Sequence, residues 1–260
     1  MGSQEASEPL SGVGEEASPE AGGVEADVLI EESSSPQVTE GVDRTNERRK
    51  EYVVSLPERG ISLYQVDEGG VFLAIGEREQ QMNWIYTTPR LVMPRLQADD
   101  YDRDGEDELA VALNTGSGTG VNVEELHIVE LPAETAPDDE PFVDRVFLPE
   151  HYMEQLRSAV TFETKIVDGE WVAYMTMEGD TYEVQLGELM EEFGEMMEDF
   201  KDKPILDEFG FGNIVYFEFG KSNADIKFTA AVGVLIEDVS EPQYFGDITA
   251  AVRYSNGEFR

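Results

Sequence analysis

The strongest chemical signal in the sequence is a run of acidic residues at regular spacing, from Asp100 to Glu108. Counted as a loop, carboxylates stand at its first, third, fifth and ninth positions, and a glycine stands at the sixth. Alternate carboxylates converge on one point when the chain curls around an ion, and the glycine permits the sharp turn. Calcium accepts about six to eight oxygen ligands at flexible angles. We therefore predict a Ca²⁺ site whose ligands are Asp100, Asp102, Asp104, the backbone carbonyl of Glu106, and Glu108.

The residues that follow this loop exclude an EF-hand. An EF-hand has a bidentate glutamate at position twelve, where a helix begins; position twelve here is Val111, inside an apolar run. The loop instead resembles the calcium loops of the FG-GAP and VCBS repeat families, in which a carboxylate at position nine precedes an apolar strand. The resemblance covers Asp100 to Val111 and implies the same ligands. Glu108 stands where aspartate is commoner, and a single copy is present, so the propeller fold of those families is not implied.

A longer segment, Gly60 to Leu131, resembles uncharacterised surface lipoproteins of Gram-positive bacteria that carry one such loop. That resemblance implies a location at the cell surface and no particular activity. The alternative interpretation of the loop is an acidic surface turn, because the chain has 57 aspartates and glutamates.

Other motifs give weaker signals. The glycine-rich run from Gly116 to Gly120 lacks the Lys-Ser/Thr pair and the following helix of a phosphate loop. We expect a hairpin loop there, with a recognition loop beside the calcium site as the alternative. Glu125 and His127 would share one face of a strand, but no second nearby histidine completes a zinc site. We expect His127 to be an ordinary strand residue.

No catalytic residue is predicted. The Gly-x-Ser-x-Gly elbow of serine hydrolases is missing from the sequence. A pair of catalytic carboxylates of the glycosidase kind is left open, because acidic residues are too abundant to single out any pair.

Composition restricts the partners. The net charge is -39, with only 18 lysines and arginines. Nucleic acids and anionic lipids are bound through such residues, so we predict no nucleic-acid partner; an acidic surface favours cations and basic partners. The absence of cysteine excludes a zinc ribbon, a thiol nucleophile and a disulfide framework.

The sequence also leads to an expectation about location. It has no apolar run of about 18 residues, so we predict no transmembrane segment. Polar sequence follows Met1 directly, with no visible signal peptide. We expect an extracellular or cell-surface protein whose signal or lipobox segment has been removed, with a lipid anchor upstream as one form of attachment. The alternative is an acidic cytosolic protein, of the kind found in salt-loving organisms.

Residue patterns divide the chain into four regions. Residues 1–46 are rich in Glu, Ser, Gly, Ala and Pro without an aromatic residue, which predicts a disordered acidic tether. Residues 51–131 are predicted to form a β domain that contains the calcium loop, and residues 132–148 an acidic loop or boundary. Residues 149–260 are predicted to form an α+β region. Expected strands in the β domain are residues 52–55, 61–66, 71–75, 84–86, 91–92, 109–113 and 121–131.

In the C-terminal region, residues 149–158 and 189–200 have the features of helices. Asp168-Gly169 and Asn256-Gly257 are typical of hairpin turns. Expected strands are residues 162–167, 170–177, 181–186, 214–219, 226–236 and 248–254. The predicted fold is α+β with β dominant: antiparallel meander and hairpin sheets with one or two helices, and not a complete propeller.

These patterns favour a secreted or lipid-anchored calcium-binding surface module. The ion would be structural, and the module would bind or scaffold an extracellular protein or glycan. The alternatives are an acidic cytosolic interaction protein and an extracellular hydrolase with an unrecognised carboxylate pair.

Overall fold

The structure is a computed structural model, and the account that follows covers its described residues. These are residues 37–39, 50–66, 70–88, 92–132, 137, 140–196, 203–221 and 224–260. Every described residue belongs to one compact unit, Ser34–Arg260. The predicted tether, residues 1–46, lies outside the described residues except for Gln37–Thr39, which forms strand β1.

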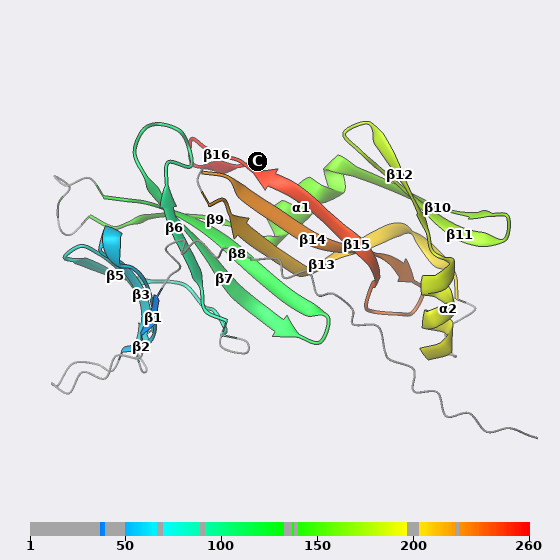
Figure 1. Ribbon diagram of the computed structural model, residues 1–260, viewed down its shortest axis with the longest axis horizontal. Coiled ribbons are helices and arrows are strands. Elements are labelled where there is room, and N and C mark those ends of the chain that lie inside the picture. The colour runs from blue at the N-terminus through cyan, green and yellow to red at the C-terminus, as the bar shows by residue number, and fades with distance from the viewer. Residues whose placement is uncertain are drawn as a thin grey trace, which may run out of the picture. The chain divides into compact units, whose positions relative to one another are not determined.

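Five strands form an antiparallel meander in which each strand pairs with the next in sequence (Figure 1). Alternate residues such as Ile61 and Leu63, or Val71 and Leu73, are buried, as expected when one face of an antiparallel sheet covers a core. The strands are β1, β2 (Lys50–Leu56), β3 (Ile61–Val66), β4 (Gly70–Ile75) and β5 (Arg78–Met82), with the 3-10 helix η1 (Pro57–Arg59) between β2 and β3.

A larger sheet has the order β15-β14-β13-β8-β7-β6, and β9 pairs with β8 as well. All its pairings are antiparallel except that of β8 with β13, which is parallel and pairs Ile214 with Asn122. Strand β9 pairs with the other end of β8, from Leu126 to Glu130. The strands are β6 (Arg95–Asp99), β7 (Glu108–Gly118), β8 (Val121–Glu130), β9 (Val143–Phe147), β13 (Ile205–Phe219), β14 (Ile226–Ile236) and β15 (Gln243–Val252).

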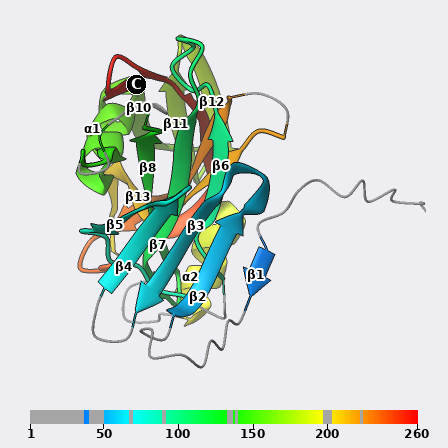
Figure 2. The same cartoon turned by 90° about the vertical axis from the view of Figure 1, so that its left-hand side faces the viewer.

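Strands β7 and β8 have a hydrophobic core on each face. Leu109 and Val111 belong to the core shared with the five-stranded sheet, whereas Ala110 and Ala112 belong to the core on the opposite face. Side chains alternate across a strand, so a strand between two cores is apolar at every position, which explains the continuous run from Leu109 to Leu113. In Figure 2 the five-stranded sheet lies in front of β6 and β7.

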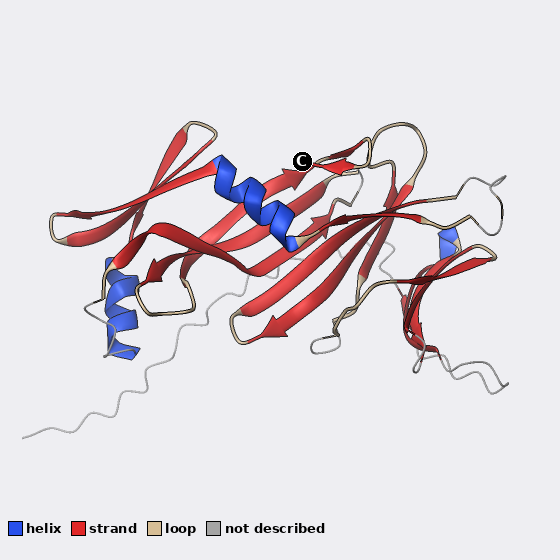
Figure 3. Cartoon of the chain, turned by 180° about the vertical axis from the view of Figure 1, so that it is seen from behind, coloured by secondary structure: helices blue, strands red, loops and turns tan. Residues whose placement is uncertain are grey.

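Helix α1 (Pro149–Ala159) covers the core that contains Ala110 and Ala112. It begins at Pro149, whose fixed φ suits the first helical position. Its buried Tyr152 packs its ring 5.9 Å from Phe217 and 5.2 Å from Phe228. Figure 3 shows the helix lying along the strands of the large sheet. The remaining elements are the antiparallel strands β10 (Val160–Val167), β11 (Glu170–Met177) and β12 (Asp180–Gln185), helix α2 (Gly187–Met196), and the hairpin of β16 (Tyr254–Ser255) and β17 (Glu258–Phe259).

A buried polar seam joins β8 to β13. Glu124, which is 4% exposed, receives hydrogen bonds from both terminal nitrogens of Arg95, at 3.0 and 2.6 Å. The backbone N–H of Phe217 donates to the same carboxylate at 2.9 Å, and Arg95 donates back to the Phe217 carbonyl at 2.8 Å. These groups therefore supply hydrogen bonds where the two strands have only one pair of residues in register.

The fold class predicted from the sequence is confirmed: the described strands form antiparallel hairpins and meanders, with two α-helices and no propeller. The predicted strands at residues 61–66, 226–236 and 170–177 have the predicted limits. Helix α1 also matches its prediction, extended by one residue at its end. Of the second predicted helix, residues 197–200 lie outside the described part of the chain.

Several local predictions were wrong. Trp84–Tyr86 was expected to be a strand but has no regular structure. The same holds for Val92 of the expected strand at residues 91–92, and Leu91 lies outside the described residues. The glycine-rich connection begins later than expected, because β7 continues to Gly118 and only residues 119–120 form the turn. Strands β5 and β6 lie in polar sequence, and β9 lies within the predicted acidic loop, residues 132–148. Each of them pairs with an apolar neighbour, so tertiary pairing overrides weak local β propensity.

The large sheet contains strands from both predicted folded regions, residues 51–131 and 149–260. No described helix is long and apolar enough to cross a membrane.

Candidate metal centre

The acidic loop connects two paired strands, β6 and β7. Asp99, the last residue of β6, lies opposite Glu108, the first residue of β7. The loop therefore leaves and returns at neighbouring points. This strand pairing brings Glu108 back beside the start of the loop.

Hydrogen bonds inside the loop fold its backbone around the carboxylates. The Oε2 atom of Glu108 accepts the N–H groups of Tyr101 at 2.8 Å and Asp102 at 3.3 Å. Oδ2 of Asp100 accepts the N–H of Gly105 at 3.1 Å. Gly105 has a φ of 98°, a backbone conformation that glycine adopts without steric cost. The glycine expected at the sixth position therefore does form the sharp turn.

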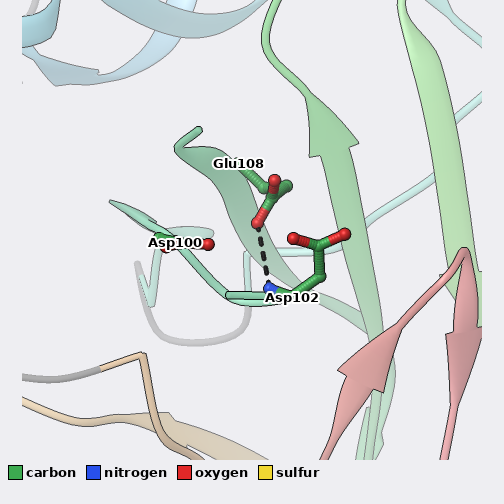
Figure 4. A group of neighbouring side chains, drawn as sticks. All are labelled: Asp100, Asp102 and Glu108. Atoms are coloured by element: carbon green, nitrogen blue, oxygen red, sulfur yellow. Dashed lines mark hydrogen bonds between the residues drawn. The ribbon is translucent and has the colours of Figure 1, made fainter. Parts of the chain in front are cut away.

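Three of the five predicted ligands converge. One carboxylate oxygen from each of Asp100, Asp102 and Glu108 lies within 4.8 Å of the others (Figure 4). Glu108 is 5% exposed, and Oδ1 of Asp100 is buried without a hydrogen-bond partner among the described residues. No described lysine or arginine pairs with any of the three. The cluster thus concentrates negative charge that the described chain does not neutralise.

Of the other two predicted ligands, Asp104 is not part of this converging group. Asp104 is exposed, and its Oδ1 accepts the N–H of Glu106 at 2.8 Å. The Glu106 side chain is exposed as well, and a ligand role for its carbonyl stays a prediction. An acidic neighbour outside the cluster, Asp107, pairs with Arg59 at 2.6 Å. The loop therefore separates its acids into a converging group and a solvated or paired group.

The environment of Glu108 opposes its charge. Burial raises the pKa of its carboxyl from 4.5 to about 7, the N–H of Tyr101 partly opposes this shift, and the charge of Asp102 adds to it. A cation placed among the three carboxylates would favour the ionised form.

The donor set decides which ions fit. Carboxylate oxygens are hard donors that suit Ca²⁺, Mg²⁺ and similar cations, and there is no nitrogen or sulfur donor among the three. The residues present therefore fit a hard divalent cation, and Ca²⁺ is the ion that best tolerates irregular loop geometry. The three carboxylates alone do not select one such ion over another.

His127 belongs to a second buried polar group. Its Nδ1 lies 3.0 Å from Oδ1 of Asp144, and the indole N–H of Trp84 donates to Oδ2 of the same aspartate at 2.6 Å. Burial alone would lower the pKa of His127, but Asp144 and Glu125 raise it, and the net pKa is raised. The prediction of a strand position is confirmed. The partners Asp144 and Trp84 were missed, because no sequence signal connects residues that lie so far apart in the chain.

Comparisons with known proteins add no family to these observations: no protein-family model, no curated protein and no solved structure gives a significant match.

Proposed function

We propose that the loop from Asp100 to Glu108 binds Ca²⁺ and that the protein is a calcium-stabilised binding or scaffold module at an extracellular surface. The observation that carries the proposal is the convergence of Asp100, Asp102 and Glu108 without a basic partner among the described residues. Asp104 and the Glu106 carbonyl complete the shell in this proposal, as in the FG-GAP and VCBS loops that the sequence resembles. Such completion needs the exposed part of the loop to close over the ion.

The position of the loop supports a structural role for the ion. Tyr101 has its ring in the core beneath the sheet, and its N–H donates to Glu108. A cation held by Asp100, Asp102 and Glu108 would cross-link the end of β6 to the start of β7. It would also offset the mutual repulsion of the three carboxylates, which otherwise opposes closing of the loop.

Magnitudes limit what the ion can do. Extracellular modules bind calcium with dissociation constants of about 0.1–1 mM. With about 1 mM free calcium, mass action then adds roughly 0.4–1.4 kcal/mol to the free energy of unfolding. An affinity in that range fills the site only where calcium is abundant, which is the basis for placing the module outside the cell.

Calorimetric titration of the purified protein with Ca²⁺ and Mg²⁺ tests the proposal. We expect one calcium site in the parent protein and loss of binding in Asp102→Asn. Asp107→Asn is the matched control, because it removes the same charge from the same loop but alters a residue paired with Arg59. Equal calcium affinity in the parent and in Asp102→Asn, or equal losses in both variants, would contradict the assignment.

A further inference from the structure

A pocket lies beside the proposed calcium site. It encloses about 740 Å³ between the loop and the ends of the C-terminal strands, a size typical of small-molecule sites. Its lining includes three consecutive loop residues, Tyr101, Asp102 and Arg103, together with Arg253 and Tyr254 from the C-terminal segment. Figure 4 shows the Asp102 carboxylate on the side of the loop that faces the red C-terminal strands. The metal loop is therefore part of the pocket and not merely near it.

The pocket contains two basic side chains without partners. Arg103 and Arg253 are exposed, and neither makes a hydrogen bond or ion pair with another described side chain. In a protein with a net charge of -39, four other described arginines form ion pairs with carboxylates: Arg59, Arg95, Arg145 and Arg260. A guanidinium group presents two parallel N–H donors, which match the paired oxygens of a carboxylate or phosphate.

One residue of the pocket lining, Tyr101, is also a core residue. Tyr101 is 5% exposed, and its hydroxyl has no hydrogen-bond partner among the described residues. Buried polar groups are normally paired with protein or water. Tyr101 both lines the pocket and belongs to the core of the large sheet, so it anchors the loop wall of the pocket in the fold.

We infer that this pocket binds a small ligand that carries an oxyanion, a carboxylate or a phosphate, between Arg103 and Arg253. The inference rests on the proposed function in one respect: calcium would fix residues 101–103, so the ligand binds more tightly when the ion is present. Asp102 and Asp225 also line the pocket. They would repel an anion when the metal site is empty, and an ion held by Asp102 removes part of that repulsion. Lys227, a further lining residue, is already paired with Glu218 at 2.9 Å.

Calorimetry with three sugars, each in saturating calcium and in EDTA, tests the inference. The probes are galacturonate, which carries a carboxylate, galactose phosphate, and neutral galactose. We expect at least one charged sugar to bind in saturating calcium and to bind at least roughly tenfold more weakly in EDTA. Galactose should give no heat. The charged sugar that binds shows whether the ligand's oxyanion is a carboxylate or a phosphate.

Arginine variants test whether the charged sugar binds in this pocket. Arg103→Gln and Arg253→Gln should each weaken binding of the charged sugar at least roughly tenfold. Neither variant should weaken calcium binding, since neither removes an oxygen ligand and the loss of a positive charge favours a cation. Arg157→Gln, which alters an exposed arginine on α1 outside the pocket, should leave both unchanged.

The outcomes separate this inference from the proposed function. Calcium binding without binding of either charged sugar overturns the inference and leaves the proposed function standing. Galactose binding as tightly as the charged sugars, or full sugar affinity in both arginine variants, also overturns it. An absence of calcium binding refutes the proposed function, and equal sugar binding in calcium and EDTA refutes the coupling between the two sites.

Discussion

Among the described residues, two glutamates are buried on the large sheet, and they differ in where their neutralising charge comes from. Glu124 is 4% exposed and Glu108 is 5% exposed. Glu124 receives two hydrogen bonds from Arg95 and one from the Phe217 backbone. Glu108 receives only backbone N–H groups, from Tyr101 and Asp102, and its charged neighbours are aspartates.

This difference indicates two roles for a buried carboxylate. Uncompensated burial of a charge is unfavourable, so a buried carboxylate is expected to have a cation. The seam at Glu124 contains its own cation and can hold β8 against β13 without an ion from solution. The loop at Glu108 depends on a cation from solution, so its local stability should vary with the ions present.

The largest expected effect is on the seam. Arg95→Met leaves Glu124 without its cation, and breaking such a pair costs about 3–5 kcal/mol when both partners are buried. Because the Arg95 side chain is 36% exposed, we expect about 2–3 kcal/mol once solvent screening is included. Urea unfolding in calcium and in EDTA should give the same loss. Arg145→Met, which breaks an exposed pair with Glu130, is the control and should cost less than about 1 kcal/mol.

Replacing each of these two glutamates by glutamine should change the free energy of unfolding in opposite directions. In EDTA at about pH 8, Glu108→Gln should stabilise the protein by about 1–3 kcal/mol, because it removes a charge that burial opposes and keeps an acceptor oxygen. Glu124→Gln should destabilise it, because Arg95 loses its counter-charge. Chemical unfolding of both variants measures the signs. If Glu108→Gln were destabilising in EDTA, the charge of Glu108 would already be compensated within the chain.

The same glutamate predicts a pH dependence in the absence of calcium. Its folded pKa of about 7 exceeds its ordinary 4.5, so the folded state binds the proton more tightly and stability falls as pH rises through this interval. Unfolding of the parent protein in EDTA at a series of pH values should show this decline, and Glu108→Gln should reduce it. An unchanged slope in the variant would assign the decline to other groups.

Smaller changes are expected at the remaining ligands. Asp102→Asn should abolish the stabilisation by calcium, roughly 0.4–1.4 kcal/mol at about 1 mM free ion, without lowering stability in EDTA. Thermal unfolding with and without calcium gives this difference, and Asp107→Asn should retain it. A variant that loses stability equally in both conditions would show that Asp102 supports the loop without binding the ion.

The smallest effect is expected at His127, a buried residue whose acidic partners, Asp144 and Glu125, belong to the chain itself. Its raised pKa means that its pairing with Asp144 stabilises the fold fully below the ordinary value of 6.5 and is lost as pH rises through the folded value. His127→Gln should therefore flatten part of the pH dependence that remains in Glu108→Gln. Unfolding of the double variant over the same pH series measures this part, and a curve identical to that of Glu108→Gln would exclude His127 as its source.

The sequence by itself determined the local features. Asp168-Gly169 and Asn256-Gly257 form turns with positive φ at both residues, because this conformation suits those residue types. The run from Asp100 to Glu108 placed the candidate ligands and the glycine turn within one short segment. Strands such as β3 and β14 were predictable, because their apolar pattern identifies surfaces that must be buried.

Tertiary structure decided which of these segments meet. Strands β5 and β6 are polar and pair only because apolar neighbours are present. The partners of Glu124 and His127 come from distant parts of the chain, and spacing in a sequence does not encode such contacts. The pocket exists because the C-terminal strands end beside the loop. Convergence of Asp100 with Glu108, likewise, depends on the pairing of β6 with β7, since a loop gathers its carboxylates only when its two ends are held together.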